Sequence, residues 1–512
     1  MKPITRLFVV AVALVAAGCA QLAPRPELRP DVAVPVGLGT PLDERIAASE
    51  AGHPGQSGFR LVSEGPEAFA IRSYSAFSAG RSLDVQTYIW HQDGTGIFLA
   101  YRLLQAADRG VKVRLLVDDM DARDKNFAFA ALAAHPNIQV RMFNPFGSRS
   151  GKVGFLLEAA GDFRRINRRM HNKTWIADNR IAIVGGRNLG DEYFGASKEV
   201  NFSDLDFAMV GPVVRDASAS FDRYWNSPLA YPVSVLSPGA VTAEALEQLR
   251  VTATPRLEKA QQSHYARALA EDDSVQRLVS GDWPMQWSAQ YRFVADDPRK
   301  AQGHDSGVAG SDVLALLGPT ILGARHRLTV ISPYFVPGEL GTAAFVKVAQ
   351  QGADVRILTN SLAANDVAMV YGGYVQWREP LLKGGVKLWE LKPTRGEPVR
   401  KSLFGSSGAS LHTKALTVDE IHTFVGSYNL DARSTSLNCE QGIFVDDPVI
   451  ARQLEDLFDA ETRPERAWRV SRQHGVIRWS DGEVVHKNTP DASAWRKFQA
   501  WFARVFPISS QL

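Results

Sequence analysis

Cysteine is scarce in this sequence, which holds only Cys19 and Cys439 among its 512 residues. Two cysteines exclude a fold that depends on a framework of disulfides. An excess of charge of one sign is also missing, because 58 Lys and Arg residues face 55 Asp and Glu residues and leave a net charge of +3. Proteins that wrap duplex nucleic acid normally carry a marked basic excess, so this balance argues against that class.

Several common catalytic motifs are absent too. The chain has no G-x-S-x-G elbow, no Walker loop, no H-E-x-x-H and no C-x-x-C. Serine-hydrolase, P-loop and zinc-enzyme interpretations therefore have no local support. What remains is an ordinary globular composition, 45% hydrophobic and 22% charged, in a chain long enough for two or three domains.

A long hydrophobic run is the last absence. The apolar run at residues 7–17 is about half as long as a bilayer-spanning helix, which disfavours a permanent transmembrane segment. Because two basic residues precede it, we expect residues 1–18 to be a signal peptide. The ending AAGC at residues 16–19 resembles the lipobox of bacterial lipoproteins, and this implies cleavage before Cys19 and lipidation of that residue. The alternative is an ordinary cleaved signal peptide with an incidental cysteine.

The segment after Cys19 is rich in proline and shows little apolar periodicity. Its prolines are Pro24, Pro26, Pro30, Pro35 and Pro41. This composition favours an extended tether at residues 19–45 over a packed element. With a lipidated cysteine at its start, we expect a protein of the cell envelope that is anchored to a membrane and faces the periplasm.

The rest of the chain repeats a strand–helix–strand unit. The segments predicted as strand, helix, strand and further strand are 83–90, 97–110, 111–119 and 138–146 in the first half, and 328–336, 342–352, 353–361 and 386–393 in the second. This order forms a right-handed crossover onto a parallel sheet. We therefore expect an α/β protein with a first domain at 46–235, a charged connecting segment at 236–310 and a second domain at 311–512.

The repeat is tightest at residues 170–190 and 411–431, which align at a constant offset of 241. The matched pairs are His171 with His412, Lys173 with Lys414, Asp178 with Asp419, Gly186 with Ser427, and Asn188 with Asn429. A single His-x-Lys would be a weak signal, because His and Lys alternate on many solvated strand faces. An ungapped repeat of this set indicates a duplicated chemical site.

Each copy predicts a β-hairpin that turns at its aspartate. The histidine and lysine of one copy share a strand face. Asp178 lies seven residues after His171. Because an odd number of positions separates them, their side chains point to opposite faces of the strand, so Asp178 cannot easily orient the His171 ring. Although Asp178 and Asp419 belong to the catalytic motif, we expect them to make turn or inter-strand hydrogen bonds.

The hairpin also predicts which residues lie beside each histidine. Counting back from a turn at the aspartate and the next residue places Gly186 opposite His171 and Ser427 opposite His412. Small residues there leave room for a ligand beside each ring. The asparagine two residues later in each copy shares that face, as a group that binds substrate phosphate.

A carboxylate from a neighbouring strand is expected to orient each histidine. Segments 204–212 and 440–448 align by their final proline, which matches Asp204 with Glu440. Either carboxylate could accept the Nδ1 proton and leave Nε2 free to attack. Asp206 has the same strand parity as Asp204 and is the second choice.

Two copies of H-x-K-x-x-x-x-D, each followed by G-G or G-S and then Asn, resemble the phospholipase D superfamily. Within it, GGRNLGDEYFG, SPYFVPG and LNCEQGIFVDD are similar to bacterial cardiolipin synthases. The resemblance implies two α/β domains, each a mixed sheet flanked by helices, related by a pseudo-twofold axis with one active site at their interface. It also implies that no metal or other cofactor takes part.

The residue types fit this chemistry. Lys173 and Lys414, with the two asparagines, can neutralise the oxygens of a phosphodiester. One histidine attacks phosphorus, while the other protonates the leaving alcohol and then deprotonates the acceptor. The resemblance assigns the nucleophile to His171 and the acid/base to His412, whereas the symmetry of the repeat does not choose between them.

The expected function is transfer of a phosphatidyl group to phosphatidylglycerol, which gives cardiolipin. Phosphatidylethanolamine is a further candidate donor, the membrane surface is an expected partner, and no nucleic-acid partner is expected. The alternatives are a hydrolytic phospholipase D, a binding protein that holds anionic headgroups without reaction and, third, a nuclease.

Two further features complete the sequence. One face of a C-terminal helix carries Trp495, Phe498, Trp501, Phe502 and Val505. That pattern suits a membrane interface, although docking of the apolar face against the second domain is the favoured interpretation. The second cysteine, next to Glu440, is expected to be a small buried residue.

Overall fold

The computed structural model describes residues 22–122, 125–148, 158, 162–303, 310–365, 367–393 and 411–505. The expected signal peptide and Cys19 with its lipidation therefore lie outside the described residues. Within those ranges, no helix combines the length and the hydropathy needed to cross a membrane.

Each half of the described chain builds one mixed β-sheet. The first sheet has the strand order β8 (Ala230–Pro232), β4 (Ile138–Phe143), β3 (Lys112–Asp118), β2 (Ser82–Thr87), β5 (Thr174–Ala177), β6 (Ile181–Gly185), β7 (Asp206–Val210), β1 (Ser57–Val62) and β9 (Gln286–Ser288). The second has the order β10 (Tyr291–Ala295), β16 (Gln441–Asp446), β15 (His422–Gly426), β14 (Ala415–Val418), β11 (Arg327–Ile331), β12 (Asp354–Asn360), β13 (Lys387–Leu391), β17 (Ala467–Gln473), β18 (Val476–Ser480) and β19 (Val485–His486).

The predicted strand–helix–strand repeat forms the centre of both sheets. In the first half, β2 and β3 are parallel neighbours joined through α4 (Gly94–Asp108), and β4 continues the parallel set. In the second half, α15 (Gly338–Gln350) joins β11 to β12, which pairs in parallel with β13. Most residues of these strands are buried, as expected for parallel strands that are covered on both faces.

Helices cover the outer face of each sheet. Those on the first half are α2 (Pro41–Ala51), α3 (Gly65–Ser78), α4, α6 (Asn126–Ala133), α10 (Val233–Leu236), α11 (Ala243–Gln261), α12 (His264–Glu271) and α13 (Asp273–Ser280). Those on the second half are α14 (Asp312–Leu322), α15, α16 (Ala368–Lys383) and α19 (Ala494–Val505). The short helices α5 (Asp119–Ala122), α8 (Phe163–Ile166) and α17 (Ala432–Ser436), with the 3-10 turns η2 (Asp191–Tyr193) and η3 (Pro298–Gln302), occupy loops.

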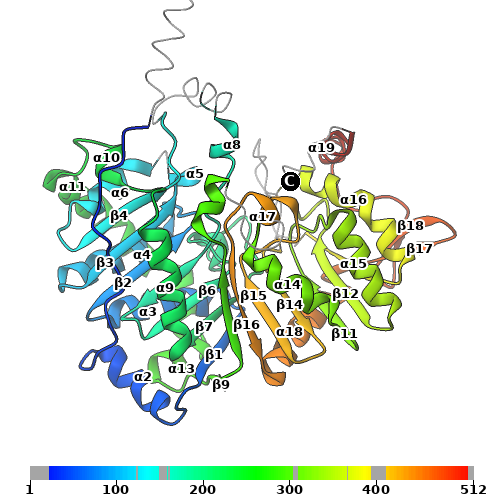
Figure 1. Ribbon diagram of the computed structural model, residues 1–512, viewed down its shortest axis with the longest axis horizontal. Helices are drawn as coiled ribbons and strands as arrows, with labels where there is room; N and C mark the ends of the chain where they lie inside the picture. The colour runs from blue at the N-terminus through cyan, green and yellow to red at the C-terminus, as the bar shows by residue number, and fades with distance from the viewer. Residues whose placement is uncertain are drawn as a thin grey trace, which may run out of the picture.

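A shared apolar core joins the two halves, which lie side by side in Figure 1. Helices α9 (Pro212–Trp225) and α18 (Pro448–Glu461) contribute to it, and so do inward-facing residues of both sheets, such as Phe207 and Ile443. Strands β15 and β16 also contact β6 and β7 directly. The two repeats therefore fold as one body, with their matching motifs facing each other across the join.

The two hairpins, β5–β6 and β14–β15, turn where the sequence predicts but with a different register. Asp178 and Asn179 have positive φ angles of 52° and 54°, as a tight type I′ turn requires. Ala177 then pairs with Ile181 instead of Arg180, because one extra residue follows the turn. The second hairpin repeats this shift. The expected placement of a small residue opposite each histidine depended on the unshifted register and is therefore wrong.

The segment expected to connect the domains, 236–310, is divided between them. Strand β9 ends the first sheet at Ser288, and β10 begins the second sheet at Tyr291. Helices α11 to α13 belong to the first half, because residues such as Val275 and Leu278 are buried in its core. The crossing between the halves thus occupies residues 289–290 alone.

The proline-rich segment is extended, as expected, but it is docked and is not a free tether. Residues 22–37, the N-terminal strap, run along the first domain without regular secondary structure. Arg25 Nε donates to the carbonyl of Ala230 at 2.8 Å, and the amide of Ala33 donates to Asp222 at 2.8 Å. The strap satisfies its backbone on the domain because it has no partner strand of its own.

Candidate active site

Both histidine–lysine pairs lie at the ends of parallel strands. Strand β5 runs antiparallel to β2 with Thr174 opposite Gln86, so Lys173 and His171 lie just beyond the carboxyl end of β2. The second half is equivalent, because Ala415 pairs with Ile331 and places the His412 motif beyond β11. Functional groups commonly gather at this edge of α/β sheets.

Two backbone bridges join the halves at this edge. Met170 forms a parallel bridge with Cys439, and Leu411 forms one with Ser203. The His171 amide donates to the Cys439 carbonyl at 2.9 Å, and the His412 amide donates to the Ser203 carbonyl at 2.7 Å. In each bridge, the residue before a histidine pairs with the residue before the matched carboxylate of the other half.

The bridges bring each histidine to a carboxylate of the opposite half. The Nδ1 atom of His171 lies 2.8 Å from Oε2 of Glu440, and Nδ1 of His412 lies 2.6 Å from Oδ2 of Asp204. Each histidine is 8% exposed as a whole residue, and both carboxylates are buried. Because Nδ1 is engaged, Nε2 is the nitrogen of each ring left for chemistry.

The alternative orienting carboxylate, Asp206, has another role. Its Oδ2 accepts from Arg72 at 2.9 Å and from Arg187 at 3.2 Å, inside the first domain. Arg187 also donates to the carbonyl of Asp204 at 2.6 Å. Asp206 therefore supports the backbone that carries Asp204 and contacts neither histidine through these bonds.

Burial keeps the two histidines neutral. It lowers the pKa of His171 to about 4, with Lys173 acting in the same direction and Glu440 opposing. Burial lowers the pKa of His412 as well. Burial also opposes ionisation of Glu440 and Asp204, but contact with their histidines outweighs it and lowers the pKa of both carboxyls. The resting site therefore holds neutral imidazoles against ionised carboxylates.

The two lysines lie beside the histidines, each tied to its own motif. Lys173 Nζ donates to the carbonyl of His171 at 2.5 Å, and Lys414 Nζ donates to that of His412 at 2.6 Å. The pKa of Lys173 is lowered to about 7, because burial and the nearby Lys414 lower it more than Glu440 raises it. An incoming anion would favour protonation of this amine again.

Gly186 and Ser427 serve the carboxylates instead of leaving space beside the histidine of their own half. A Cβ on Gly186 would lie 2.2 Å from Oδ1 of Asp204, so glycine is needed where the two backbones approach. Ser427 Oγ donates to Glu440 at 2.5 Å, and its carbonyl lies 3.1 Å from Nδ1 of His171. Both residues thus act on the histidine of the opposite half.

The two asparagines differ although the motifs match. Asn188 Oδ1 accepts from the Ile89 amide at 3.1 Å, and its Nδ2 donates to the Tyr193 hydroxyl at 2.9 Å. Its amide is therefore held by the protein at both ends, with one Nδ2 hydrogen not used in these two bonds, and its role in binding phosphate stays a prediction. Asn429 Oδ1 is buried without a hydrogen-bond partner among the described residues, which leaves this amide oxygen for a substrate group.

Asp178 and Asp419 brace the hairpins. The Asp178 carboxylate accepts from the amides of Gly80, Arg81 and Ser82 at 2.9, 2.7 and 3.0 Å. Asp419 accepts from three successive amides, residues 325–327, before β11 in the same way. These bonds agree with the structural role expected for the two aspartates from the alternation of side chains along the strand. Because the carboxylates bind backbone amides, they are not available for catalysis.

Sequence reasoning missed the groups that hold the two rings. Tyr88 lies edge-on to His171, while Tyr193 lies edge-on to His412 and Phe202 stacks on it. The Ser434 hydroxyl donates to Oε1 of Glu440 at 2.8 Å. The aromatic residues between GGRN and DLDF were the one available signal, but their contacts depend on tertiary structure.

The surroundings of His91, His422 and Cys439 differ from those of the two motif histidines. His91 lies 2.9 Å from Glu192, and His422 lies 2.8 Å from Asp446; both are surface pairs. Cys439 is buried, and burial raises the pKa of its thiol to about 12, so it stays a neutral packing residue.

Comparisons with known proteins agree with this geometry. A family model described as "Cardiolipin synthase, PLD-like domain" matches residues 76–225 and 317–462. The chain is 38% identical over 466 residues to cardiolipin synthase C of Escherichia coli (strain K12), covering 89% of this chain and 96% of that protein. It is 25% identical over 426 residues to cardiolipin synthase A of Pseudomonas syringae pv. syringae (strain B728a), covering 82% and 71%.

A solved structure shares the fold. The phosphatidylserine synthase of Haemophilus influenzae Rd KW20 aligns with a TM-score of 0.58 over 91% of this chain and 100% of that chain, at 13% identity. The two ranges matched by the family model make up more than half of the chain, and each contains one histidine–lysine motif. The chain therefore belongs to the phospholipase D superfamily, in its cardiolipin synthase-like family.

Proposed function

We propose that this protein transfers a phosphatidyl group to the headgroup hydroxyl of phosphatidylglycerol and so produces cardiolipin. The observation that carries the proposal is the pair of histidine–carboxylate contacts formed across the halves, at 2.8 and 2.6 Å. Two buried imidazoles with oriented Nε2 atoms supply both a nucleophile and an acid/base to one phosphodiester. Similarity to the curated cardiolipin synthases supports the choice of lipid.

In the first step, Nε2 of His171 attacks phosphorus while the bond from phosphorus to the headgroup oxygen breaks. Binding of the anionic phosphodiester favours uptake of a proton by His412, which then gives this proton to that oxygen, and the headgroup alcohol leaves. The products are a phosphatidylated His171 and a neutral His412. The ammonium groups of Lys173 and Lys414 offset the charge on the phosphoryl oxygens.

In the second step, neutral His412 takes the proton from the hydroxyl of the acceptor lipid. The acceptor oxygen attacks phosphorus, the bond from phosphorus to Nε2 of His171 breaks, and His412 is protonated again. With phosphatidylglycerol as both donor and acceptor, the balanced products are cardiolipin and glycerol. With water as the acceptor, the product is phosphatidic acid.

The support around the two histidines favours His171 as the nucleophile. Its partner Glu440 is fixed by the hydroxyls of Ser427 and Ser434 and by the backbone amide that it donates to Asp296. In contrast, the Asp204 carboxylate accepts from the Leu205 amide in addition to His412. A more rigidly held ring suits a group that must form a bond in line with the leaving oxygen.

The proposal also names the membrane surface at which the reaction takes place. A lipidated Cys19 would anchor the protein to a membrane facing the periplasm, and the membrane surface would supply phosphatidylglycerol, with phosphatidylethanolamine as a further donor. The near-neutral net charge of +3 supports lipid over nucleic acid as the substrate.

Incubation with liposomes of phosphatidylglycerol, followed by lipid chromatography, tests the proposal. We expect cardiolipin and glycerol, and we expect no turnover by His171→Ala or His412→Ala. His422→Ala, which removes a surface histidine with its own carboxylate partner, is the matched control and should keep full activity. Phosphatidic acid as the sole product would make the protein a hydrolase.

An acid quench during turnover tests the covalent step. A phosphatidylated enzyme should be trapped from the wild-type protein and not from His171→Ala. An active enzyme that never yields an adduct would contradict the phosphohistidine mechanism, and an inert protein that binds phosphatidylglycerol would be a lipid-binding protein.

A further inference from the structure

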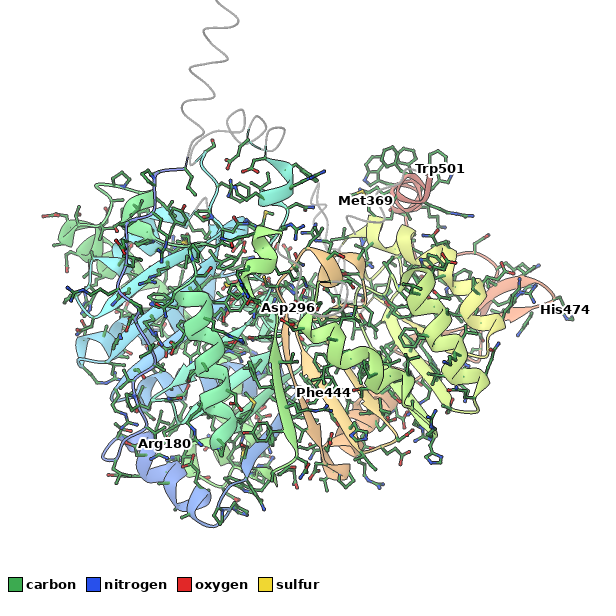
Figure 2. All side chains as sticks on the ribbon, viewed as in Figure 1. Arg180, Asp296, Met369, Phe444, His474 and Trp501 are labelled. Carbon is green, nitrogen blue, oxygen red and sulfur yellow. The ribbon has the colours of Figure 1, made fainter. Side chains whose placement is uncertain are left out.

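Helix α19 carries large aromatic side chains on its exposed side. Trp495, Phe498, Trp501 and Phe502 are 62%, 47%, 55% and 38% exposed. Their spacing places them on one arc of the helix. This set is called the α19 aromatic face. In Figure 2 the labelled Trp501 lies on this helix at the upper edge of the second half, near Met369 of α16.

The opposite side of α19 is docked on the second domain. Ala500 and Ala503 are buried in its core, and a Cβ on Gly372 of α16 would lie 2.3 Å from the Ala500 carbonyl. Small residues thus let the two helices approach closely. The docking that the sequence favoured is present, and the two alanines lie in it.

Helix α19 is also tied to the edge that carries the active site. Arg496 donates to the carbonyls of Leu362 and Asn365, in the loop that follows β12. Asn360, the last residue of β12, forms two hydrogen bonds of 2.9 Å with the backbone of Leu411, which is next to His412. The aromatic face therefore lies at the end of the second sheet that carries His412.

Two other features lie at the same end of the molecule. The described chain begins at the same upper edge of the molecule, as Figure 1 shows. The exposed cations Lys497 and Arg504 lie on α19 beside the aromatic face. Tryptophan and phenylalanine beside lysine and arginine are the residues that interfacial helices use against anionic lipid.

We propose that the α19 aromatic face inserts into the interfacial region of an anionic phospholipid bilayer and holds the active-site edge against it. This inference rests on the proposed function in one respect, namely that the substrate is a bilayer lipid. The contact adds a second attachment to any anchor at Cys19 and fixes the orientation of the protein. An anchor at Cys19 alone would attach the protein at one point and would not fix its tilt against the membrane.

Tryptophan fluorescence tests this contact without requiring turnover. The other nine tryptophans of the chain are buried or partly buried, so Trp495 and Trp501 are the exposed pair. In proteoliposomes of phosphatidylglycerol with brominated acyl chains, we expect quenching of the full-length protein. The Trp495→Phe/Trp501→Phe variant should lose most of that quenching. Absence of quenching in the wild-type protein, or its persistence in the variant, would overturn the proposal.

Activity provides a second, independent measurement. Replacing all four aromatic residues by serine should lower turnover of phosphatidylglycerol in vesicles by about tenfold or more, because apolar burial in the bilayer is lost. Turnover of a short-chain, monomeric phosphatidylglycerol should be unchanged, which separates membrane contact from chemistry. Phe77→Ser is the matched control. Phe77 is 58% exposed on α3, close to the amino end of β2 and therefore at the end of the first sheet away from the histidines. Equal activity of the serine variant on vesicles would contradict the inference.

Discussion

Glu440 lies 2.8 Å from Nδ1 of His171, although 269 positions separate the two residues and they belong to different halves of the chain. Asp204 and His412 form the reciprocal pair at 2.6 Å. Neither half therefore contains a complete site, because each supplies the histidine of one pair and the carboxylate of the other.

The crossed pairing predicts which histidine each carboxylate variant disturbs. Glu440→Gln should shift the ring ¹⁵N resonances of His171 and leave those of His412 in place, whereas Asp204→Asn should do the reverse. Each variant should lower kcat by about 10²–10⁴-fold, because its histidine loses the acceptor that fixes the tautomer. NMR of histidine-labelled protein and lipid turnover measure these effects.

Asp446→Asn is the matched control for those variants. Asp446 pairs with the surface residue His422 from the same strand that follows Glu440, so its loss should leave turnover unchanged. Disturbance of His412 by Glu440→Gln, with His171 unaffected, would rule out the crossed arrangement.

Gly186→Ala should impair chemistry through Asp204. The added Cβ would lie 2.2 Å from Oδ1 of this carboxylate, which must move and then loses its contact with Nδ1 of His412. We expect a loss of activity of about 10²-fold or more in a protein that still folds. Gly318→Ala in α14 is the control, since nothing lies within 4 Å of its Cβ and alanine favours a helix. Full activity of Gly186→Ala in the lipid assay would refute this role.

Asp178→Asn should damage folding more than chemistry. The carboxylate accepts three backbone amides at the turn, and a neutral amide cannot replace all of these bonds, so we expect a loss of about 2–4 kcal/mol of unfolding free energy. Denaturant unfolding gives that loss, and turnover per folded molecule should stay near that of the wild type. A stable Asp178→Asn protein without activity would contradict the structural role.

Anion binding should weaken as the pH rises above about 7. Burial lowers the pKa of Lys173 to about 7, so the amine loses its proton above that pH and must regain it when an anion binds. The affinity for tungstate, a tetrahedral dianion, should therefore fall by up to about tenfold per pH unit above 7, with proton uptake seen by calorimetry. Lys173→Arg keeps its charge and should flatten the profile. A flat profile in the wild-type protein would show that Lys173 stays charged.

Local sequence patterns predicted much of the fold and which residues form the active site. Runs of apolar, β-branched and aromatic residues followed by glycine-ended helices predicted the parallel strands of both halves, because such runs are typical of buried strands. The ungapped repeat identified both histidines and both lysines. The alignment of segments 204–212 and 440–448 by their final proline identified Asp204 and Glu440. The parity of Asp178 predicted its role in the turn, since alternation along a strand depends only on sequence distance.

Tertiary structure alone decided how these residues are assembled. One extra residue after each turn changed the hairpin register, and backbone bridges between the halves gave each histidine the carboxylate of the other. The proline-rich strap docked on the first domain because its amides and its arginine found partners there. In α19 the alanines pack against the domain while the tryptophans stay exposed. Each outcome depends on contacts between segments far apart in the chain. The pattern of residues within one segment does not show which distant segment will pack against it.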